Sequence, residues 1–268
     1  MNEIQQHYNE IEEKDRLGSG LGLLEKERTQ QIITRYLGKS SSKILDVGGA
    51  AGVYAFWLAS TGHEVSLIDP SEKHIQQAIS INDQTKNKLA SIAVGDARDL
   101  CKHENETFDC ILFLGPLYHL IIKEDRLRAL NECFRVLKKG GLLFAAGINR
   151  YASLYDGLSR GLIDDPNFIS IMKQDLLNGQ HRNPSNHPGY FTTAVFQLPV
   201  EMELEIKEAK CSLIKTLPVE GPVWFVNSFE DRWAEAEKRS KLLYMLESLE
   251  DNSIGLLLTL HYIAVARK

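Results

Sequence analysis

Apolar residues recur with two different periods between residues 43 and 150. Short apolar runs predict buried strands at 43–47, 64–68, 89–94, 108–114 and 141–146. Apolar residues at helical spacing predict helices between them at 52–60, 71–82 and 124–138. Strands that alternate with amphipathic helices are typical of right-handed crossovers, which build a parallel sheet with helices on both faces. The pattern therefore predicts an α/β fold.

The alternation of strands and helices stops between residues 151 and 200. This stretch predicts one short helix at 167–178, followed by a run rich in histidine and asparagine. So long an excursion without apolar strands is typical of a cap over a site. The pattern resumes after it with a helix at 200–209, a strand at 211–217, a helical stretch at 229–250 and a final strand at 256–266.

We expect a single domain over residues 1–268. Residues 1–16 show an amphipathic helical pattern, and a second helix is predicted from Leu23 to Leu37. The expected parts of the domain are an N-terminal helical lid at 1–38, a cofactor-binding half at 43–150, a cap insertion at 151–200 and the C-terminal part of the sheet at 201–268. An ordinary packing helix is the alternative to a lid at the N-terminus.

Composition narrows the class of protein. A net charge of -5 favours a small-molecule or protein substrate over nucleic acid. The four cysteines lack the spacing of metal ligands, so we expect neither a metal site nor a disulfide framework. The N-terminal residues are polar and acidic, and no apolar run approaches the roughly 18 residues of a membrane span. We therefore expect a cytoplasmic protein without a membrane partner.

Small residues fill the turn between the first strand and the first helix of this half. Gly48, Gly49, Ala50 and Gly52 follow Asp46 within a few positions. Glycine adopts positive φ and lets a ligand approach the backbone, because it has no Cβ atom. Close packing of the helix on the strand also explains a glycine turn, and hydrogen bonding within the turn also explains Asp46.

Carboxylates follow the next two strands. Asp69 comes about 20 residues after the glycine turn, where an acidic residue accepts hydrogen bonds from ribose hydroxyls. The segment Asp69-Pro70-Ser71 is also a good helix start. Asp96 and Ala97 follow the third strand. Because open α/β sheets bind ligands at the carboxyl ends of their strands, these residues indicate a nucleoside-containing cofactor.

These motifs resemble the class I S-adenosylmethionine-dependent methyltransferases, in particular a bacterial small-molecule subgroup. The segment 46–52 looks like their acidic glycine motif, and 95–97 looks like their adenine-contacting motif. The strand 108–114 and the turn at 135–141 are similar to the fourth strand and to the turn before the fifth. The resemblance implies a Rossmann-like sheet of seven strands with the last strand, 256–266, antiparallel.

The resemblance also implies the cofactor and the residues that bind it. S-adenosylmethionine would be the methyl donor and S-adenosylhomocysteine the product. The implied cofactor-binding residues lie in the glycine turn, at the ends of the following strands and in the N-terminal segment: Asp46, Gly48, Gly49, Ala50, Gly52, Asp69, Pro70, Asp96, Ala97, Leu114 and Tyr8. In this family, the acid on the first strand serves near the methionine ammonium.

Two positions depart from the family pattern and keep alternatives open. Ala50 replaces the usual middle glycine, and its methyl group is tolerated there if φ is negative. Lys139 replaces the usual proline. Ala50 favours the alternative of a non-catalytic sensor or scaffold that binds S-adenosylmethionine. An NAD(P)-dependent Rossmann dehydrogenase is the other alternative, but its fingerprint requires the wider spacing G-x-G-x-x-G and gives Asp46 no task.

The predicted reaction is an in-line displacement that moves a methyl group to an oxygen or nitrogen atom of a small-molecule acceptor. Such an enzyme aligns the acceptor with the methyl carbon and excludes water. His119, after the fourth strand, is the predicted base or orienting group, although a helix-start histidine bonded to backbone is equally consistent with its position. Predicted acceptor contacts are Tyr118, Arg150, Arg182, His187 and Tyr190, with Arg160 and His181 as further candidates in the same region.

Overall fold

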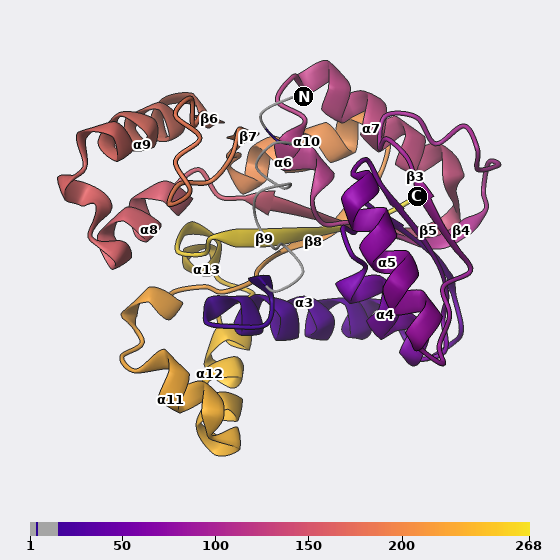
Figure 1. Ribbon diagram of the computed structural model, residues 1–268, viewed down its shortest axis with the longest axis horizontal. Helices are drawn as coiled ribbons and strands as arrows, with labels where there is room; N and C mark the ends of the chain where they lie inside the picture. The colour runs from indigo at the N-terminus through magenta and orange to yellow at the C-terminus, as the bar shows by residue number, and fades with distance from the viewer. Residues whose placement is uncertain (1–3, 5–15) are drawn as a thin grey trace.

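A seven-stranded sheet forms the centre of the computed structural model, which describes residue 4 and residues 16–268. The strands follow the order β3-β2-β1-β4-β5-β9-β8 (Figure 1). Their bounds in this order are Ser91–Val94, Glu64–Asp69, Lys43–Val47, Phe108–Phe113, Leu137–Ile148, His261–Arg267 and Ser212–Pro218. The strands from β3 to β5 are parallel, and β9 is antiparallel to both β5 and β8. The Rossmann-like fold predicted from the sequence is confirmed.

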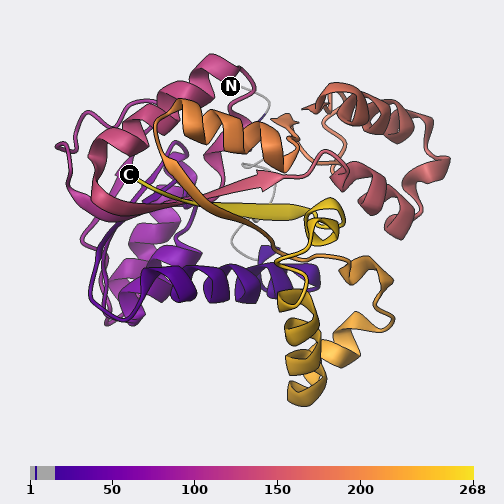
Figure 2. The same ribbon diagram turned by 180° about the vertical axis from the view of Figure 1, so that it is seen from behind.

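Helices cover both faces of the sheet (Figures 1 and 2). The helices α3 (Leu21–Leu37), α4 (Val53–Ser60) and α5 (Glu72–Gln84) pack on one face, and α7 (Lys123–Val136) and α10 (Pro199–Glu208) pack on the other. Strand β4 shows why the sequence of a central strand is a nearly continuous apolar run. Cys110 belongs to the core under α3 and α4, whereas its neighbour Ile111 belongs to the core under α7 and α10. Both faces of such a strand are buried.

Several elements differ from the sequence predictions. Strand β5 begins at Leu137 instead of residue 141. The predicted helical stretch 229–250 divides into α11 (Phe229–Ala234) and α12 (Ala236–Glu247), because Glu235 between them is extended. Helix α13 (Ser253–Leu257) occupies the predicted start of the last strand, and the Asn252 side chain caps it by accepting a hydrogen bond from the Ile254 N–H. A helix that was not predicted, α8 (Ala152–Arg160), opens the cap.

The described part of the expected N-terminal lid is a core helix. Ile32 and Ile33 of α3 are fully buried against the sheet, and Arg28 is buried in an ion pair with Glu250. This part of 1–38 therefore forms a layer of the domain. The predicted helix at 1–16 and the predicted cofactor contact Tyr8 lie outside the described residues, apart from residues 4 and 16.

The segment 151–200 forms a small unit beyond the carboxyl end of β5 (Figure 2). Its elements are α8, the 3-10 turn Leu162–Asp164, α9 (Pro166–Asn178), and the two short paired strands β6 (Gln180–His181) and β7 (Ala194–Val195). The fully buried Asp175 fastens this unit, because it accepts a hydrogen bond from the Ser153 hydroxyl and lies 2.8 Å from His181 Nδ1.

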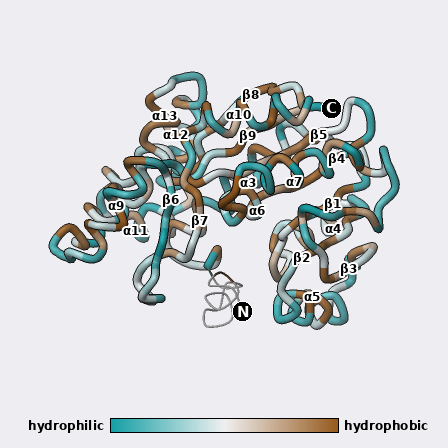
Figure 3. The backbone as a smooth tube through the Cα atoms, turned by 90° about the horizontal axis from the view of Figure 1, so that it is seen from above, coloured by the Kyte–Doolittle hydropathy of each residue, from teal (hydrophilic) through white to brown (hydrophobic). Residues whose placement is uncertain are grey.

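Figure 3 places α9 and β6 at one side of the molecule and α5 with β3 at the other. The cap therefore stands at the β5 and β9 side of the sheet. Within the described part of the chain, no helix is both long and apolar enough to cross a membrane.

Candidate cofactor and acceptor site

The turn between β1 and α4 needs glycine for two physical reasons. Gly48 and Gly52 have φ values of +71° and +89°, in the left-handed region that favours glycine. A Cβ atom would also lie 2.7 Å from Pro116 Cγ at Gly48, and 2.4 Å from Asp46 Oδ2 at Gly49. The Gly48 N–H donates to the Ile68 carbonyl at 2.7 Å, which fixes the turn against β2.

Ala50 is left-handed, contrary to the negative φ under which its methyl group was expected to fit. Its φ is +50°, a conformation that costs an L-residue about 1–2 kcal/mol. The Ala50 N–H donates to Asp69 Oδ2 at 2.9 Å. We infer that this hydrogen bond from the neighbouring strand end holds the unfavourable conformation.

Asp46 carries a buried carboxylate at the start of the turn. Its side-chain atom Oδ2 has no hydrogen-bond partner among the residues that the structure describes. Burial raises the pKa of Asp46 to about 7, and the charge of Asp69 adds to the effect. An unpaired buried carboxylate is costly unless a cationic group compensates it. The site therefore fits the ammonium of a methionine moiety.

Asp69 already has close partners at the end of β2. Its Oδ1 atom accepts a hydrogen bond from the Ser71 N–H at 2.9 Å and lies 3.0 Å from His74 Nδ1. Both carboxylate oxygens are thus engaged with the protein, and each retains acceptor capacity for a ribose hydroxyl. Pro70 follows directly and is exposed.

Asp96 follows the neighbouring strand β3, whose register pairs Val94 with Asp69. Its carboxylate accepts hydrogen bonds from Arg98, which lower its pKa. Ala97 next to it is buried, and Leu114 follows β4 at the same edge of the sheet. Within the described part of the chain, the predicted cofactor residues therefore share one edge.

The next loop joins this edge to the cap. Helix α6 (Pro116–His119) follows β4, and the Tyr118 hydroxyl donates to the Leu114 carbonyl at 3.3 Å. His119 Nδ1 lies 3.4 Å from the Thr193 carbonyl oxygen. The His119 ring stacks on Phe191 with a centroid distance of 5.9 Å. Both predicted residues of this loop thus lie at the junction with the cap.

The predicted acceptor contacts of the cap have internal partners. Arg150 forms a bidentate ion pair with Glu201. Arg182 donates to the Gln180 side chain at 2.6 Å and to the His181 carbonyl at 2.9 Å. Their contact with an acceptor stays a prediction.

The other two candidates lie close together. Tyr190 is buried, and its hydroxyl bonds to Asp165. His187 accepts a hydrogen bond from the Gly189 N–H and packs on the Tyr190 ring. These contacts hold the cap in its conformation, and here too a direct role in acceptor binding stays a prediction.

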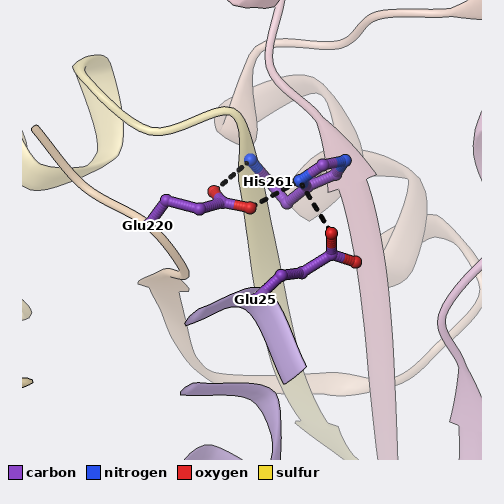
Figure 4. Close-up of side chains that lie close together, drawn as sticks. All are labelled: Glu25, Glu220 and His261. Atoms are coloured by element: carbon purple, nitrogen blue, oxygen red, sulfur yellow. Dashed lines mark hydrogen bonds and ion pairs between the residues drawn. The ribbon is translucent and has the colours of Figure 1, made fainter. Parts of the chain in front are cut away.

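Sequence reasoning missed a cluster made of Glu25, Glu220 and His261 (Figure 4). His261 Nδ1 lies 2.6 Å from Glu220 Oε1 and 3.9 Å from Glu25 Oε2. The three residues come from α3, from the loop after β8 and from the first position of β9. No spacing in the sequence connects them. The antiparallel entry of β9 pairs His261 with Ile148 and so brings it to the carboxyl end of β5.

A cavity of about 300 Å³ adjoins this cluster. It lies between the start of α3, the cap helix α8 and the start of β9, and it is lined by Arg16, Leu21, Gly22, Glu25, Asp156, Ser159, Arg160, Glu220, Trp224, Leu260 and His261. A larger hollow of about 750 Å³ is lined by α7 and the loop after β3, and neither lining includes a residue of the glycine turn. We take the smaller cavity as the candidate acceptor pocket because the carboxylates and the imidazole of this cluster line it.

One apolar cluster lies between the acceptor pocket and the loop after β4. Leu260 of the pocket and Tyr118 of that loop both pack against it. Burial raises the pKa of Tyr54, in the first turn of α4, and the Glu25 carboxylate of the pocket raises it further.

Part of the chain is similar in sequence to known methyltransferases. Residues 45–145 match the family described as methyltransferase domain. The chain is 30% identical over 104 residues to a glycine/sarcosine N-methyltransferase of Aphanothece halophytica, which covers 38% of this chain and 39% of the relative. It is also 30% identical over 116 residues to a ubiquinone biosynthesis O-methyltransferase of Thiobacillus denitrificans, which covers 43% of this chain and 48% of the relative. The chain thus spans less than half the length of these two relatives.

Solved structures share the fold over nearly the whole chain. A Methanosarcina mazei structure titled as a SAM-dependent methyltransferase has a TM-score of 0.60 at 20% identity and covers 88% of this chain and 96% of that one. A Pyrococcus horikoshii protein has a TM-score of 0.62 at 18% identity and covers 98% of both chains. These structures share the fold of the chain, and the family match identifies residues 45–145 as a methyltransferase domain.

Proposed function

We propose that this chain is an enzyme that transfers a methyl group from S-adenosylmethionine to an oxygen or nitrogen atom of a small molecule. The observation that carries the proposal is the buried Asp46 carboxylate beside the glycine turn, whose Oδ2 atom has no hydrogen-bond partner among the described residues. S-adenosylmethionine supplies a methyl group on a positively charged sulfonium. Asp46 would compensate its ammonium, and Asp69 and Asp96 would hold its nucleoside part.

The protein's contribution to the reaction is alignment. Holding the acceptor in line with the methyl carbon supplies roughly 7–11 kcal/mol of the barrier reduction without a proton transfer. The pocket between α3, α8 and β9 offers such a position, because its Leu260 packs against the same apolar cluster as Tyr118, which follows β4. Side chains from three separate elements would surround an acceptor bound there and reduce its contact with water.

A small acceptor is favoured by the pocket volume of about 300 Å³. One relative is named as a glycine/sarcosine N-methyltransferase, and the other as a ubiquinone biosynthesis O-methyltransferase. Both matches cover less than half of this chain. They therefore support methyl transfer as the reaction class and leave the acceptor atom open between nitrogen and oxygen.

Calorimetric titration with S-adenosylmethionine, S-adenosylhomocysteine and NADH tests the proposal. We expect the wild-type protein to bind both sulfur compounds and not NADH. The Asp69→Ala variant should lose this binding, while the control Asp83→Ala, on the exposed face of α5, should keep it. Binding of NADH alone would support the dehydrogenase alternative. Binding of S-adenosylmethionine without methyl transfer to any acceptor would support the sensor alternative.

A further inference from the structure

Glu220 holds the His261 imidazole in a fixed orientation. The Glu220 carboxylate is 1% exposed and accepts hydrogen bonds from the His261 backbone N–H at 2.8 Å and from the Thr259 hydroxyl at 3.0 Å. Its other oxygen lies 2.6 Å from His261 Nδ1. An ionised carboxylate at this distance selects the neutral tautomer in which Nδ1 carries the proton, because a carboxylate only accepts.

The second ring nitrogen of His261 is directed away from the carboxylates. Figure 4 shows Nε2 at the end of the ring opposite to the interactions with Glu220 and Glu25. The side chain is 23% exposed and lines the acceptor pocket. In the tautomer that Glu220 selects, Nε2 carries a lone pair and can accept a proton from a ligand in the pocket that His261 lines. A base oriented by a carboxylate at its other nitrogen is the arrangement that activates hydroxyl groups in many enzymes.

The charges around His261 stabilise its protonated form. Burial lowers the pKa of His261, but the Glu220 and Glu25 carboxylates outweigh burial and raise the pKa above its usual value of 6.5. Glu25 itself stays ionised, because Arg16 forms a bidentate ion pair with it and lowers its pKa to about 2. An imidazolium formed during a reaction is thus compensated by two ionised neighbours.

We propose that His261 is the general base of this enzyme and that the acceptor carries a hydroxyl group, as a phenol or an alcohol. This proposal rests on the proposed function. The acceptor O–H bond breaks as an N–H bond forms at Nε2, and the acceptor oxygen bonds to the methyl carbon as the carbon–sulfur bond breaks. The sulfur keeps that electron pair, the product is a methyl ether, and the imidazolium later releases its proton to water.

A hydroxyl group is the acceptor class that needs a general base. An unprotonated amine or a carboxylate attacks the methyl group without losing a proton first, whereas a neutral hydroxyl is a weak nucleophile until its proton is removed. Leu21, Trp224 and Leu260 give the pocket an apolar part beside the base. A flat aromatic ring with a hydroxyl group therefore matches the pocket better than a small zwitterion.

Methyl transfer from labelled S-adenosylmethionine to catechol and phenol, with glycine and histamine as amine probes, tests the proposal. We expect transfer to a hydroxyl probe and a kcat/KM that rises with pH, because Nε2 must be unprotonated. His261→Gln should lower kcat at least about 100-fold with S-adenosylmethionine affinity unchanged. Glu220→Gln should move the rising limb to lower pH, because it removes the charge that raises the His261 pKa. The matched control His63→Gln, at the amino end of β2, should retain kcat.

Nitrogen NMR of labelled histidines provides a readout that does not depend on the acceptor. We expect the Nδ1–H tautomer for neutral His261 and a lower His261 pKa in the Glu220→Gln variant. The Nε2–H tautomer, full turnover in His261→Gln, transfer to amines alone, or no transfer to either hydroxyl probe while S-adenosylmethionine binds would each overturn the proposal. The proposed function itself fails if the protein does not bind S-adenosylmethionine or methylates none of the four probes, whereas transfer to amines alone would overturn only the present proposal.

Discussion

Asp46 and Asp69 lie at the ends of two neighbouring parallel strands, and burial together with the Asp69 charge keeps Asp46 close to half-protonated at neutral pH. One of these carboxylates is engaged with backbone N–H groups, whereas Oδ2 of the other has no partner among the described residues. The two acids thus divide their tasks before a ligand arrives. Asp69 holds the turn through backbone N–H groups, and Asp46 keeps one carboxylate oxygen available for a ligand.

Binding of S-adenosylmethionine should therefore release a proton from Asp46. The ammonium favours the ionised carboxylate, so we expect the affinity to rise as the pH increases through about 7. Calorimetry in two buffers with different ionisation heats measures the released proton. The Asp46→Asn variant should bind about 10- to 100-fold more weakly and without proton release. Equal proton release in this variant would contradict the assignment to Asp46.

The same pKa predicts how the stability of the ligand-free protein changes with pH. The folded protein retains a proton on Asp46 up to about pH 7, whereas the unfolded chain loses it near pH 4, so the folded state binds more protons in this window. The Asp46 contribution to the free energy of unfolding should thus fall between pH 4 and 7, by on the order of 4 kcal/mol. Urea unfolding of wild type and Asp46→Asn across this range isolates the effect, which the variant should lack.

The Ala50→Gly substitution should stabilise the protein. Ala50 has a φ of +50°, which costs an L-residue but not glycine, so we expect a gain of about 1 kcal/mol in the free energy of unfolding. The control Ala234→Gly, at an exposed position of α11, should instead cost about 0.5–1 kcal/mol. Urea unfolding compares both variants. A loss of stability in Ala50→Gly would show that the methyl group contributes packing that outweighs the backbone strain.

Loss of the buried ion pair between Arg28 and Glu250 should destabilise the packing of α3. Both side chains are nearly inaccessible to solvent, so Arg28→Ala leaves a buried carboxylate with Arg35 as its remaining ionic partner among the described residues. We expect a cost of about 3–5 kcal/mol in the free energy of unfolding. The exposed pair of Lys241 with Glu237 is the control.

Lys241→Ala should change the free energy of unfolding by less than about 1 kcal/mol, because water screens this pair. Equal effects of Arg28→Ala and Lys241→Ala would contradict the role assigned to burial.

The cap should affect turnover more than cofactor binding. Tyr190→Phe removes the hydroxyl that bonds to Asp165, and single substitutions of Arg182 and His187 remove two further contacts within the cap. We expect each variant to lower kcat while the affinity for S-adenosylmethionine changes less than twofold. The Asp165→Asn variant weakens the same hydrogen bond and leaves the tyrosine intact. It therefore separates the structural role of this bond from a direct contact between Tyr190 and the acceptor. Unchanged kinetics in all three cap variants would contradict a cap over the acceptor.

The cofactor half of the fold was predictable because its signals are local. Alternating apolar periods and the glycine turn lie within about 100 consecutive residues, and each of these patterns can be recognised in a short stretch of sequence. The conformation of Ala50 was not predictable, because a hydrogen bond from Asp69 on another strand stabilises it. The cluster of Glu25, Glu220 and His261 could not be predicted either. Glu25 is separated from Glu220 and His261 by most of the chain, and the three meet only when the whole sheet is assembled.

The position of β9 between β5 and β8 also has a consequence for biosynthesis. On the ribosome, β8 is made well before β9, yet β9 is the neighbour to which it pairs in the sheet. Until β9 leaves the exit tunnel, one edge of β5 and the whole of β8 therefore lack the strand to which they pair. Because β9 also brings His261 to Glu220, the last strand to emerge closes the sheet and assembles the acceptor pocket in the same event.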